Sequence, residues 1–371
     1  MLTVHPSIML GSYLWDEDLV PSDEFDLRMA PLKAAMAERG LTAMLVYGDA
    51  REHQALAFFT NFIPRMRWAM ALFPAKGAPR LLASMSSRDM PAMRTMTWVP
   101  DVKSGWEWKW FEEFIAMLGE SGRIGSMGFD LMTPLLFNQL DKTLVTRFFL
   151  VPCDDIADVA RAAQRPREIS IIRRASEIAR AARDAIAAHW AAGGDLENSA
   201  LAGERVARSM AVQDVRTLVS RDGGRTLEPY AASFGDRPEK LLAYIALKYL
   251  GYWAESFVSS GASQQSRTQS SKTLDVLIDG LQAHAPVGTL VGRVLERAGP
   301  QHPALQGSFG HRIGLSPNEG RLLVTNSRET IVPGTTYALR VGSPEGAIAS
   351  AMVAVKADGK CEILLRSDPK E

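Results

Sequence analysis

Cysteine is scarce in this chain, since its 371 residues include only Cys153 and Cys361. Two cysteines cannot form a disulfide framework or a cysteine-rich zinc site, and such low usage is typical of a reducing cytoplasm. Net charge is lacking as well, because 42 Lys and Arg residues balance 42 Asp and Glu residues. A net charge of zero gives no indication of electrostatic capture of nucleic acid. We therefore expect a cytoplasmic protein that binds no nucleic acid.

Long apolar runs are also missing. No segment approaches the roughly 20 apolar residues of a membrane-spanning helix, so no membrane association is expected. Residues 1–15 have neither a basic start nor a sustained apolar stretch, and no signal peptide is expected. The length suits two domains of about 100–200 residues each.

The first half of the chain alternates segments typical of helices and strands. Apolar residues recur at helical spacing over 26–40, and the apolar run 43–47 is typical of a buried strand. Further elements are predicted as a helix over 51–59 and strands over 68–73, 80–83 and 123–127. This alternation predicts an α/β domain over residues 1–160.

The second half repeats one order of elements. Two helices, over 166–190 and 196–210, precede strands over 216–220 and around the turn at 251–252. The second set is predicted as helices over 272–285 and 289–298 and strands over 322–325, 336–341, 349–355 and 361–364. The order predicts an α+β domain over residues 161–371, made of two similar halves.

The stretch 310–320 has the strongest motif in the chain. His311 lies between Gly310 and Gly314, and Glu319 follows eight residues after the histidine. Glycine lets main chain approach a ligand closely, and histidine suits proton transfer or metal ligation. The glycines are expected to leave space beside the imidazole, so that the ring faces a cavity. The alternative is a glycine-rich turn with an exposed histidine.

This stretch resembles the glycine-histidine signature of the superfamily of creatinase, prolidase, aminopeptidase P and methionine aminopeptidase, which has the pita-bread fold. The resemblance extends over nearly the whole chain from about Asp26. It implies an α+β protein with a creatinase-like N-terminal α/β domain over 1–160 and a pseudo-twofold pita-bread domain over 161–371. It also implies activity of the creatinase or Xaa-Pro peptidase type, which is hydrolysis.

Most members of this superfamily bind two metal ions through two Asp, one His and two Glu side chains. The resemblance places Tyr244, Glu255, His311, Arg340 and Ser350 at these five positions. One ligand is retained, one is a longer acid, and Arg340 would bring a fixed positive charge to the site. We therefore expect no metal and no other cofactor.

Creatinase is similar in fold but hydrolyses its guanidino substrate without metal. Its general-base histidine would fall in the loop 223–229, where Glu228 is the only acid–base group here. The side chains expected in the cavity are His311, Glu255, Glu319, Tyr244, Tyr252, Glu228 and Arg340. A carboxylate beside a histidine can act as a general acid–base pair. Arg340 would either bind a substrate carboxylate or form an ion pair with Glu255.

Creatinases also carry an arginine, just before an N-terminal strand, that reaches the active site of the neighbouring subunit. The nearest equivalent here is Arg67, with Arg65 close by. Arginine's planar fork suits carboxylates, although a solvated loop arginine is the alternative. The resemblance thus implies a homodimer in which the partner's N-terminal domain lies near the active site.

The favoured hypothesis is a metal-independent, creatinase-like hydrolase that cleaves a C–N bond in a small, carboxylate-bearing, amino-acid-like substrate. His311 would carry the proton, and Glu255 and Glu319 would orient it or share protons. Arg340 and the partner chain's Arg67 would bind the carboxylate. Two alternatives are a non-catalytic pseudo-peptidase that binds another protein and a silent subunit of an active paralogue.

Overall fold

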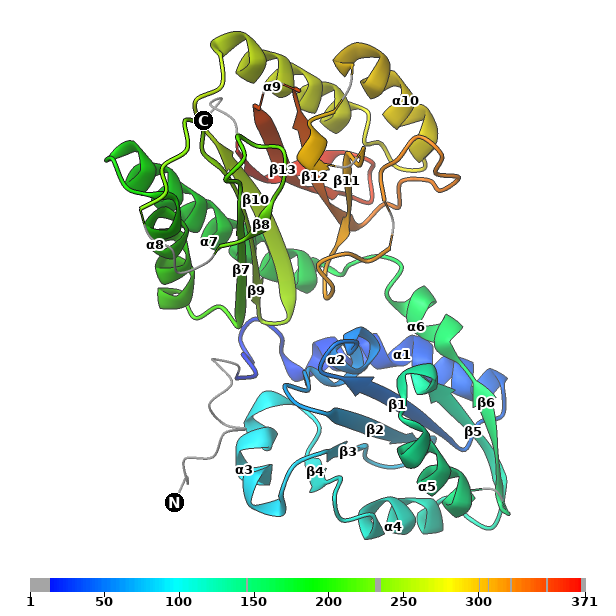
Figure 1. Cartoon of the computed structure of the whole chain (residues 1–371). Helices are drawn as coiled ribbons and strands as arrows, with labels where there is room; N and C mark the ends of the chain where they lie inside the picture. The colour runs from blue at the N-terminus through cyan, green and yellow to red at the C-terminus, as the bar shows by residue number, and fades with distance from the viewer. Residues whose placement is uncertain are drawn as a thin grey trace. The chain divides into compact units, whose positions relative to one another are not determined.

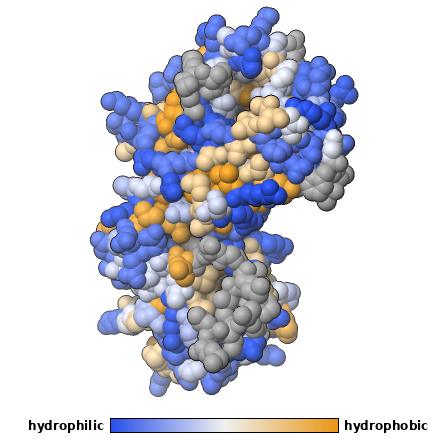
Figure 2. All heavy atoms as spheres, turned by 90° about the vertical axis from the view of Figure 1, so that its left-hand side faces the viewer, coloured by the Kyte–Doolittle hydropathy of each residue, from blue (hydrophilic) through white to orange (hydrophobic). Residues whose placement is uncertain are grey.

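The structure is a computed structural model that describes residues 14–144, 146–230, 235–299, 301–305, 307–320, 322–344 and 346–367. It divides into two compact units, Met1–Ala162 and Ala163–Glu371 (Figure 1). Hydrophilic residues cover most of the face drawn in Figure 2. Within the described ranges, no helix is long and apolar enough to cross a membrane.

The first unit is built on one mixed sheet. Its strands are β1 (Ala43–Asp49), β2 (Trp68–Pro74), β3 (Arg80–Ala83), β4 (Asp101–Ser104), β5 (Gly122–Met127) and β6 (Phe148–Pro152). They lie in the order β4-β3-β2-β1-β5-β6, and β1 pairs antiparallel with β2 but parallel with β5.

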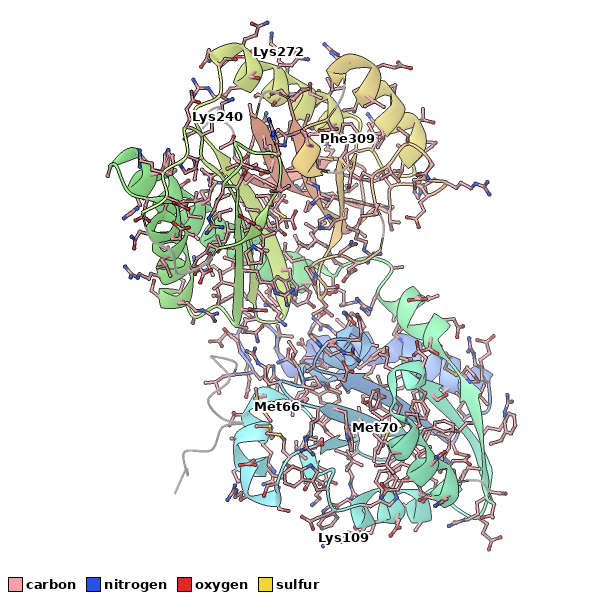
Figure 3. The ribbon with its side chains drawn as sticks, in the orientation of Figure 1. Met66, Met70, Lys109, Lys240, Lys272 and Phe309 are labelled. Atoms are coloured by element: carbon pink, nitrogen blue, oxygen red, sulfur yellow. The ribbon has the colours of Figure 1, made fainter. Side chains whose placement is uncertain are left out.

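Helices cover both faces of this sheet. They are α1 (Ser22–Glu38), α2 (Gln54–Thr60), α3 (Met90–Met93), α4 (Lys109–Met117), α5 (Pro134–Leu144) and α6 (Asp154–Ala160). Alternate side chains of β1 point to opposite faces, and Leu45 and Tyr47 join the apolar cluster that α4 and α5 cover. Met70 of β2, labelled in Figure 3, belongs to the same cluster. The predicted N-terminal α/β domain is confirmed.

The first half of the second unit holds α7 (Pro166–Ala191), α8 (Leu196–Ser209), β7 (Asp214–Val219), β8 (Glu228–Pro229), β9 (Leu242–Tyr249) and β10 (Tyr252–Ser259). The strands form an antiparallel sheet in the order β10-β9-β7-β8. Pro166 occupies the first turn of α7, where its missing N–H costs no hydrogen bond. The turn between β9 and β10 uses Gly251 at a φ of 88°.

The second half holds α9 (Gln264–Asp279), α10 (Val287–Ala298), β11 (Gly310–Ile313), β12 (Thr335–Gly342), β13 (Ile348–Val355) and β14 (Cys361–Arg366). The strands form an antiparallel sheet in the order β11-β12-β13-β14. Tyr337, Leu339 and Val341 point from β12 into the core under α9 and α10, together with Phe309 (Figure 3). Two helices and four strands thus occur twice, which confirms the predicted α+β architecture.

The two sheets of this unit are joined where β10 meets β13. The backbone N–H of Phe257 donates to Oγ of Ser350 at 3.1 Å, and Oγ of Ser259 donates to the carbonyl of Ile348 at 3.3 Å. Because these bonds fix one sheet against the other, side chains on the inner faces of both sheets are held close together.

One predicted helix begins well before the expected residue, and one predicted strand does not form. Helix α9 begins at Gln264 and not at Lys272, because Ser263 caps it by accepting from the backbone of Ser266. The first two turns of α9 carry serines, whereas the apolar stripe that predicts the helix begins only at Leu274. No strand forms over 322–325, since Leu322 makes only an isolated bridge before the chain turns at 325–326.

Candidate active site

Three side chains converge on the buried carboxylate of Glu255. The hydroxyl of Tyr244 donates to Oε2 of Glu255 at 2.7 Å. Nε2 of His311 lies 3.4 Å from the same oxygen, and Nη1 of Arg340 lies 3.8 Å from Oε1. Only 5% of the Glu255 surface is exposed, so these contacts act in a poorly solvated site.

Strand register explains why these side chains meet. Tyr244 pairs with Phe257, so Glu255 is its diagonal neighbour on the same face of the β9–β10 hairpin. His311 pairs with Ala338, which places Arg340 two residues further along the same face of β12. The hydrogen bonds between β10 and β13 then bring the two inner faces together.

The surroundings of Glu255 favour its ionised form. Burial alone would raise the pKa of this carboxyl, but His311, Arg340 and the Tyr244 hydroxyl outweigh that effect and lower the pKa below its ordinary value. The pKa of Tyr244 is well above its ordinary value because the phenol is buried and faces the Glu255 charge. Tyr244 is therefore a neutral hydrogen-bond donor to a carboxylate.

The imidazole of His311 is buried, and neither ring nitrogen forms a well-directed hydrogen bond within the described ranges. Nε2 faces Glu255, whereas Nδ1 has no partner there. The neighbouring glycines do not leave open space as expected. A Cβ on Gly310 would lie 2.1 Å from the carbonyl of Ala338, and one on Gly314 would lie 2.8 Å from Glu319. Gly310 instead lets the main chain of β12 pack closely, and Gly314 makes room for the side chains of Gln164 and Glu319.

A cavity of about 420 Å³ lies beside this cluster in the second unit. Tyr244 and Arg340, which both contact Glu255, form part of its wall. Phe257 and several leucines supply an apolar side, and Arg225 and Thr226 supply polar groups. Its volume is in the range of small-molecule sites, which is roughly 300–1,000 Å³.

The residues present do not fit a dinuclear metal centre. Ser350 is used to join the sheets, since its Oγ accepts from Phe257 and donates to Oγ of Ser367 at 3.0 Å. A divalent ion at Glu255 would lie close to the Arg340 guanidinium, and at roughly 4 Å two unit charges of like sign repel by about 4 kcal/mol near a protein surface. Across the described part of the chain, no cluster of three or more His, Cys, Asp or Glu side chains could hold a metal.

Two of the sequence-predicted residues lie away from Glu255. Tyr252 points to the other face of β10, where its hydroxyl donates to Oε1 of Glu168 at 2.8 Å and so ties the hairpin to α7. Glu228 is half-exposed and pairs with Nη1 of Arg221 at 2.8 Å.

Glu319 also serves the framework. Its Oε2 lies 3.2 Å from Nε of Arg312, whose side chain leaves β11 on the face opposite to His311. Its Oε1 accepts from the backbone of Leu315 at 3.1 Å. These contacts close the loop after β11, so the structure does not bring Glu319 to the Glu255 carboxylate.

Arg67 belongs to the first unit, in the loop before β2. Its side chain is exposed, and the guanidinium carbon lies 5.5 Å from the ring centre of Trp106. The backbone has a φ of 55°, which is rare outside glycine.

Sequence reasoning missed Arg225, which lines the cavity. The loop that carries it is organised by Asp222, whose Oδ1 accepts from the backbone of Arg225 at 2.9 Å and of Thr226 at 3.0 Å. Burial opposes ionisation of Asp222, but bonds from Thr226, Ser220 and Arg225 outweigh it and lower the pKa of this carboxyl. The available signal was position, because this is the loop in which creatinase's general-base histidine was expected.

Comparisons with known proteins agree with this architecture. Residues 28–163 match the family model of the Creatinase/Prolidase N-terminal domain. A sequence search of curated proteins gave no match.

Solved structures extend the similarity to the whole chain. The prolidase from Pyrococcus horikoshii OT3 has 12% identity and a TM-score of 0.72, over 92% of this chain and 99% of that one. The X-Pro aminopeptidase from Thermotoga maritima MSB8 has 17% identity and a TM-score of 0.72, over 88% and 97%. The N-terminal domain of FACT complex subunit SPT16 from chickpea has 13% identity and a TM-score of 0.61, over 92% and 96%. The chain therefore carries a creatinase/prolidase N-terminal domain at residues 28–163 and, as a whole, has the fold of the prolidases and X-Pro peptidases.

Proposed function

We propose that this protein is a metal-independent hydrolase that cleaves a C–N bond in a small, carboxylate-bearing substrate. The observation that supports it most directly is the Glu255 carboxylate, which is buried and ionised, lies against His311, and is separated from the cavity by Arg340 and Tyr244. A histidine held by a carboxylate is a suitable proton carrier, as in other acid–base sites.

The roles follow from the charges. Glu255 is a weak base near neutral pH because its pKa is lowered, so it orients His311 and stabilises the imidazolium that forms. His311 removes a proton from the attacking water and delivers it to the leaving nitrogen. One C–O bond forms and one C–N bond breaks, and a single water molecule is consumed. Because Nε2 faces Glu255, Nδ1 is the atom left to exchange the proton. Both ring nitrogens are buried and His311 does not line the cavity, so the water must reach Nδ1 by a movement of Tyr244 or Arg340.

Arg340 and Tyr244 supply the remaining polar groups. Nη1 of Arg340 faces Glu255, and the Arg340 side chain also lines the cavity, where its guanidinium binds the substrate carboxylate. Tyr244 remains protonated and fixes the rotamer of Glu255. Metal independence is part of the proposal because a guanidinium, a phenol and a hydroxyl occupy three positions that carry acids in metal-binding relatives.

The test is a hydrolysis screen of N-acyl amino acids, guanidino and amidino acids, and X-Pro dipeptides with protein freed of metal by chelation. His311→Ala should lower kcat by about 10²–10⁴-fold, as removal of a general acid–base group does. Glu296→Gln, an exposed change on α10, is the control and should leave kcat unchanged. Turnover that requires added metal, or an unchanged kcat in His311→Ala, would refute this mechanism.

A second candidate is a non-catalytic binding module or silent subunit. It is favoured by the fact that Tyr244, His311 and Arg340 all contact Glu255, so the cluster can satisfy its own charges. The FACT subunit SPT16 domain from chickpea has a similar fold. No turnover of any of these substrate classes by the folded protein would favour this candidate.

A further inference from the structure

The cavity beside Glu255 has charge of one sign on its wall. Arg225 and Arg340 line it, and within the described ranges no acidic side chain does. Arg340 is partly neutralised by Glu255 at 3.8 Å. Arg225 is exposed and forms no ion pair with the described residues. An occupant of this cavity would therefore have to be anionic to complement the wall.

The rest of the wall is largely apolar. Leu227, Phe257 and Leu305 line the cavity and also belong to one small hydrophobic cluster. The rings of Phe257 and Tyr244 lie 5.0 Å apart, centre to centre, and form an aromatic corner. Such a surface binds an apolar body by removing it from water. The wall thus combines cationic ends with room for an apolar or aromatic group.

A free ammonium group would be poorly accommodated there. An amino acid or dipeptide carries an ammonium as well as a carboxylate, and burying that ammonium without a carboxylate partner is unfavourable. Two carboxylates near this wall are already in use, since Glu255 is contacted by Tyr244, His311 and Arg340. Asp222 accepts hydrogen bonds from Ser220, Arg225 and Thr226. An acylated nitrogen removes this problem because an amide is uncharged.

We propose that Arg225 is a specificity-determining residue that, together with Arg340, selects an anionic substrate with an acylated nitrogen, such as an N-acyl amino acid, over a zwitterion with a free ammonium. This inference rests on the proposed function, in which the amide nitrogen is the leaving group. It goes further because it assigns a role to a second arginine and excludes free dipeptides as preferred substrates.

The loop geometry supports a fixed position for Arg225. Asp222 accepts hydrogen bonds from two backbone amides of the loop and from Oγ1 of Thr226 at 2.8 Å. Oγ of Ser220 donates to Asp222 at 2.8 Å and accepts from the backbone of Gly224 at 2.8 Å. A loop held in this way can present a guanidinium to a ligand without first becoming ordered, which lowers the entropic cost of binding.

Two ligands that differ only at the nitrogen end test the proposal. N-acetyl-L-phenylalanine and glycyl-L-phenylalanine share the carboxylate, the aromatic group and the amide, but only the dipeptide has an ammonium. Isothermal titration calorimetry on the full chain should show tighter binding of the acetylated ligand. Arg225→Gln should weaken that binding by about 10- to 100-fold, the usual worth of a charge-assisted hydrogen bond. Arg293→Gln, an exposed arginine of α10, is the matched control and should bind as wild type.

The outcomes separate this proposal from the proposed function. Equal or tighter binding of the dipeptide, an unchanged affinity in Arg225→Gln, or no binding of either ligand would overturn the specificity role. Arg225-dependent binding of the acetylated ligand without hydrolysis would leave the specificity role standing and refute the hydrolase. Hydrolysis that prefers the dipeptide and is lost in His311→Ala would support the hydrolase and refute the specificity role of Arg225.

Discussion

The phenol of Tyr244 donates a 2.7 Å hydrogen bond to Oε2 of Glu255 across the β9–β10 hairpin. Tyr244 is a neutral donor and Glu255 is an ionised acceptor, so the phenol satisfies one oxygen of this buried carboxylate. Arg340 adds a positive charge on the other oxygen of the same carboxylate.

Removing the phenol oxygen should destabilise the second unit. Tyr244→Phe leaves a buried, ionised carboxylate with one donor fewer, and hydrogen bonds to charged groups contribute about 1.5–3 kcal/mol. Guanidinium denaturation at neutral pH should show a loss of that size in the free energy of unfolding. In the double variant with Glu255→Gln, the loss should be smaller than the sum of the single losses. Strict additivity would mean that the two side chains do not interact.

The stability contributed by Glu255 should depend on pH. Its folded-state pKa is lower than in the unfolded chain, so the contribution is present above the unfolded value near 4.5 and is lost as pH falls through the folded value. Glu255→Gln should therefore cost most at neutral pH, about 3 kcal/mol or more for a broken buried ion pair, and progressively less in acid.

Subtracting the two stability curves isolates this residue. The pKa of Asp222 is also lowered, and the acid loss of the wild type includes its contribution, but Asp222 is present in both proteins. A difference between wild type and Glu255→Gln that stays constant from neutral to acidic pH would show that the Glu255 carboxyl is not ionised in the folded protein.

The fold could be predicted because its signals are local. Apolar periodicity marks α7, a continuous apolar run marks β1, and the segment after Arg165 contains a proline that starts a helix. The start of α9 was missed because buried serines, Ser266 and Ser270, take the place of apolar residues and bond to the chain around Ser343 and Ala347. Such polar packing has no periodic signature in a single sequence.

The candidate site was predictable only in part. The resemblance assigned Tyr244 and Glu255 to two corresponding positions before and after the turn at 251–252, and the register of the β9–β10 hairpin puts both side chains on one face. Spacing does not reveal that Glu319 pairs with Arg312, since that contact depends on which face each side chain of β11 takes. For Arg225 the only signal was its place in the loop 223–229, because the cavity wall that it joins is assembled from several distant segments.

A methyl group at Gly310 should be poorly tolerated. The φ of this residue is 142°, and an added Cβ would lie 2.1 Å from the carbonyl oxygen of Ala338, which is main chain and cannot move aside. Gly310→Ala should cost about 3 kcal/mol or more in unfolding free energy. Gly320→Ala is the control, since it also has a positive φ, 77°, but meets nothing within 4 Å. It should cost about 1 kcal/mol. Equal losses would show that β11 does not pack so closely on β12.

The assembly is expected to be a homodimer. The exposed Arg67 and its neighbour Trp106 offer a cation and an aromatic ring to a second chain. Light scattering at micromolar concentration should give twice the chain mass of 40.6 kDa. A mixture of two variants tests whether Arg67 completes the partner's site. Each of Arg67→Gln and His311→Ala alone should lack activity. The mixed dimer should recover part of it, because one of its two sites has both an intact Arg67 and an intact His311. A monomer, or a mixture without recovery, would remove Arg67 from the site.

Introducing carboxylates around Glu255 and His311 should create a metal site. The combined substitutions Tyr244→Asp, Arg340→Glu and Ser350→Glu would surround Glu255 and His311 with three further carboxylates and remove the guanidinium. Mn²⁺ and Co²⁺ accept oxygen and imidazole ligands, so the triple variant should bind them in calorimetric titrations. Wild type should show no comparable binding, because Arg340 repels the cation and Tyr244 and Ser350 supply no charge.

Adding His311→Ala to the triple variant should weaken the binding again. Tight stoichiometric metal binding by wild type would show that these five residues are not the ones that determine metal affinity.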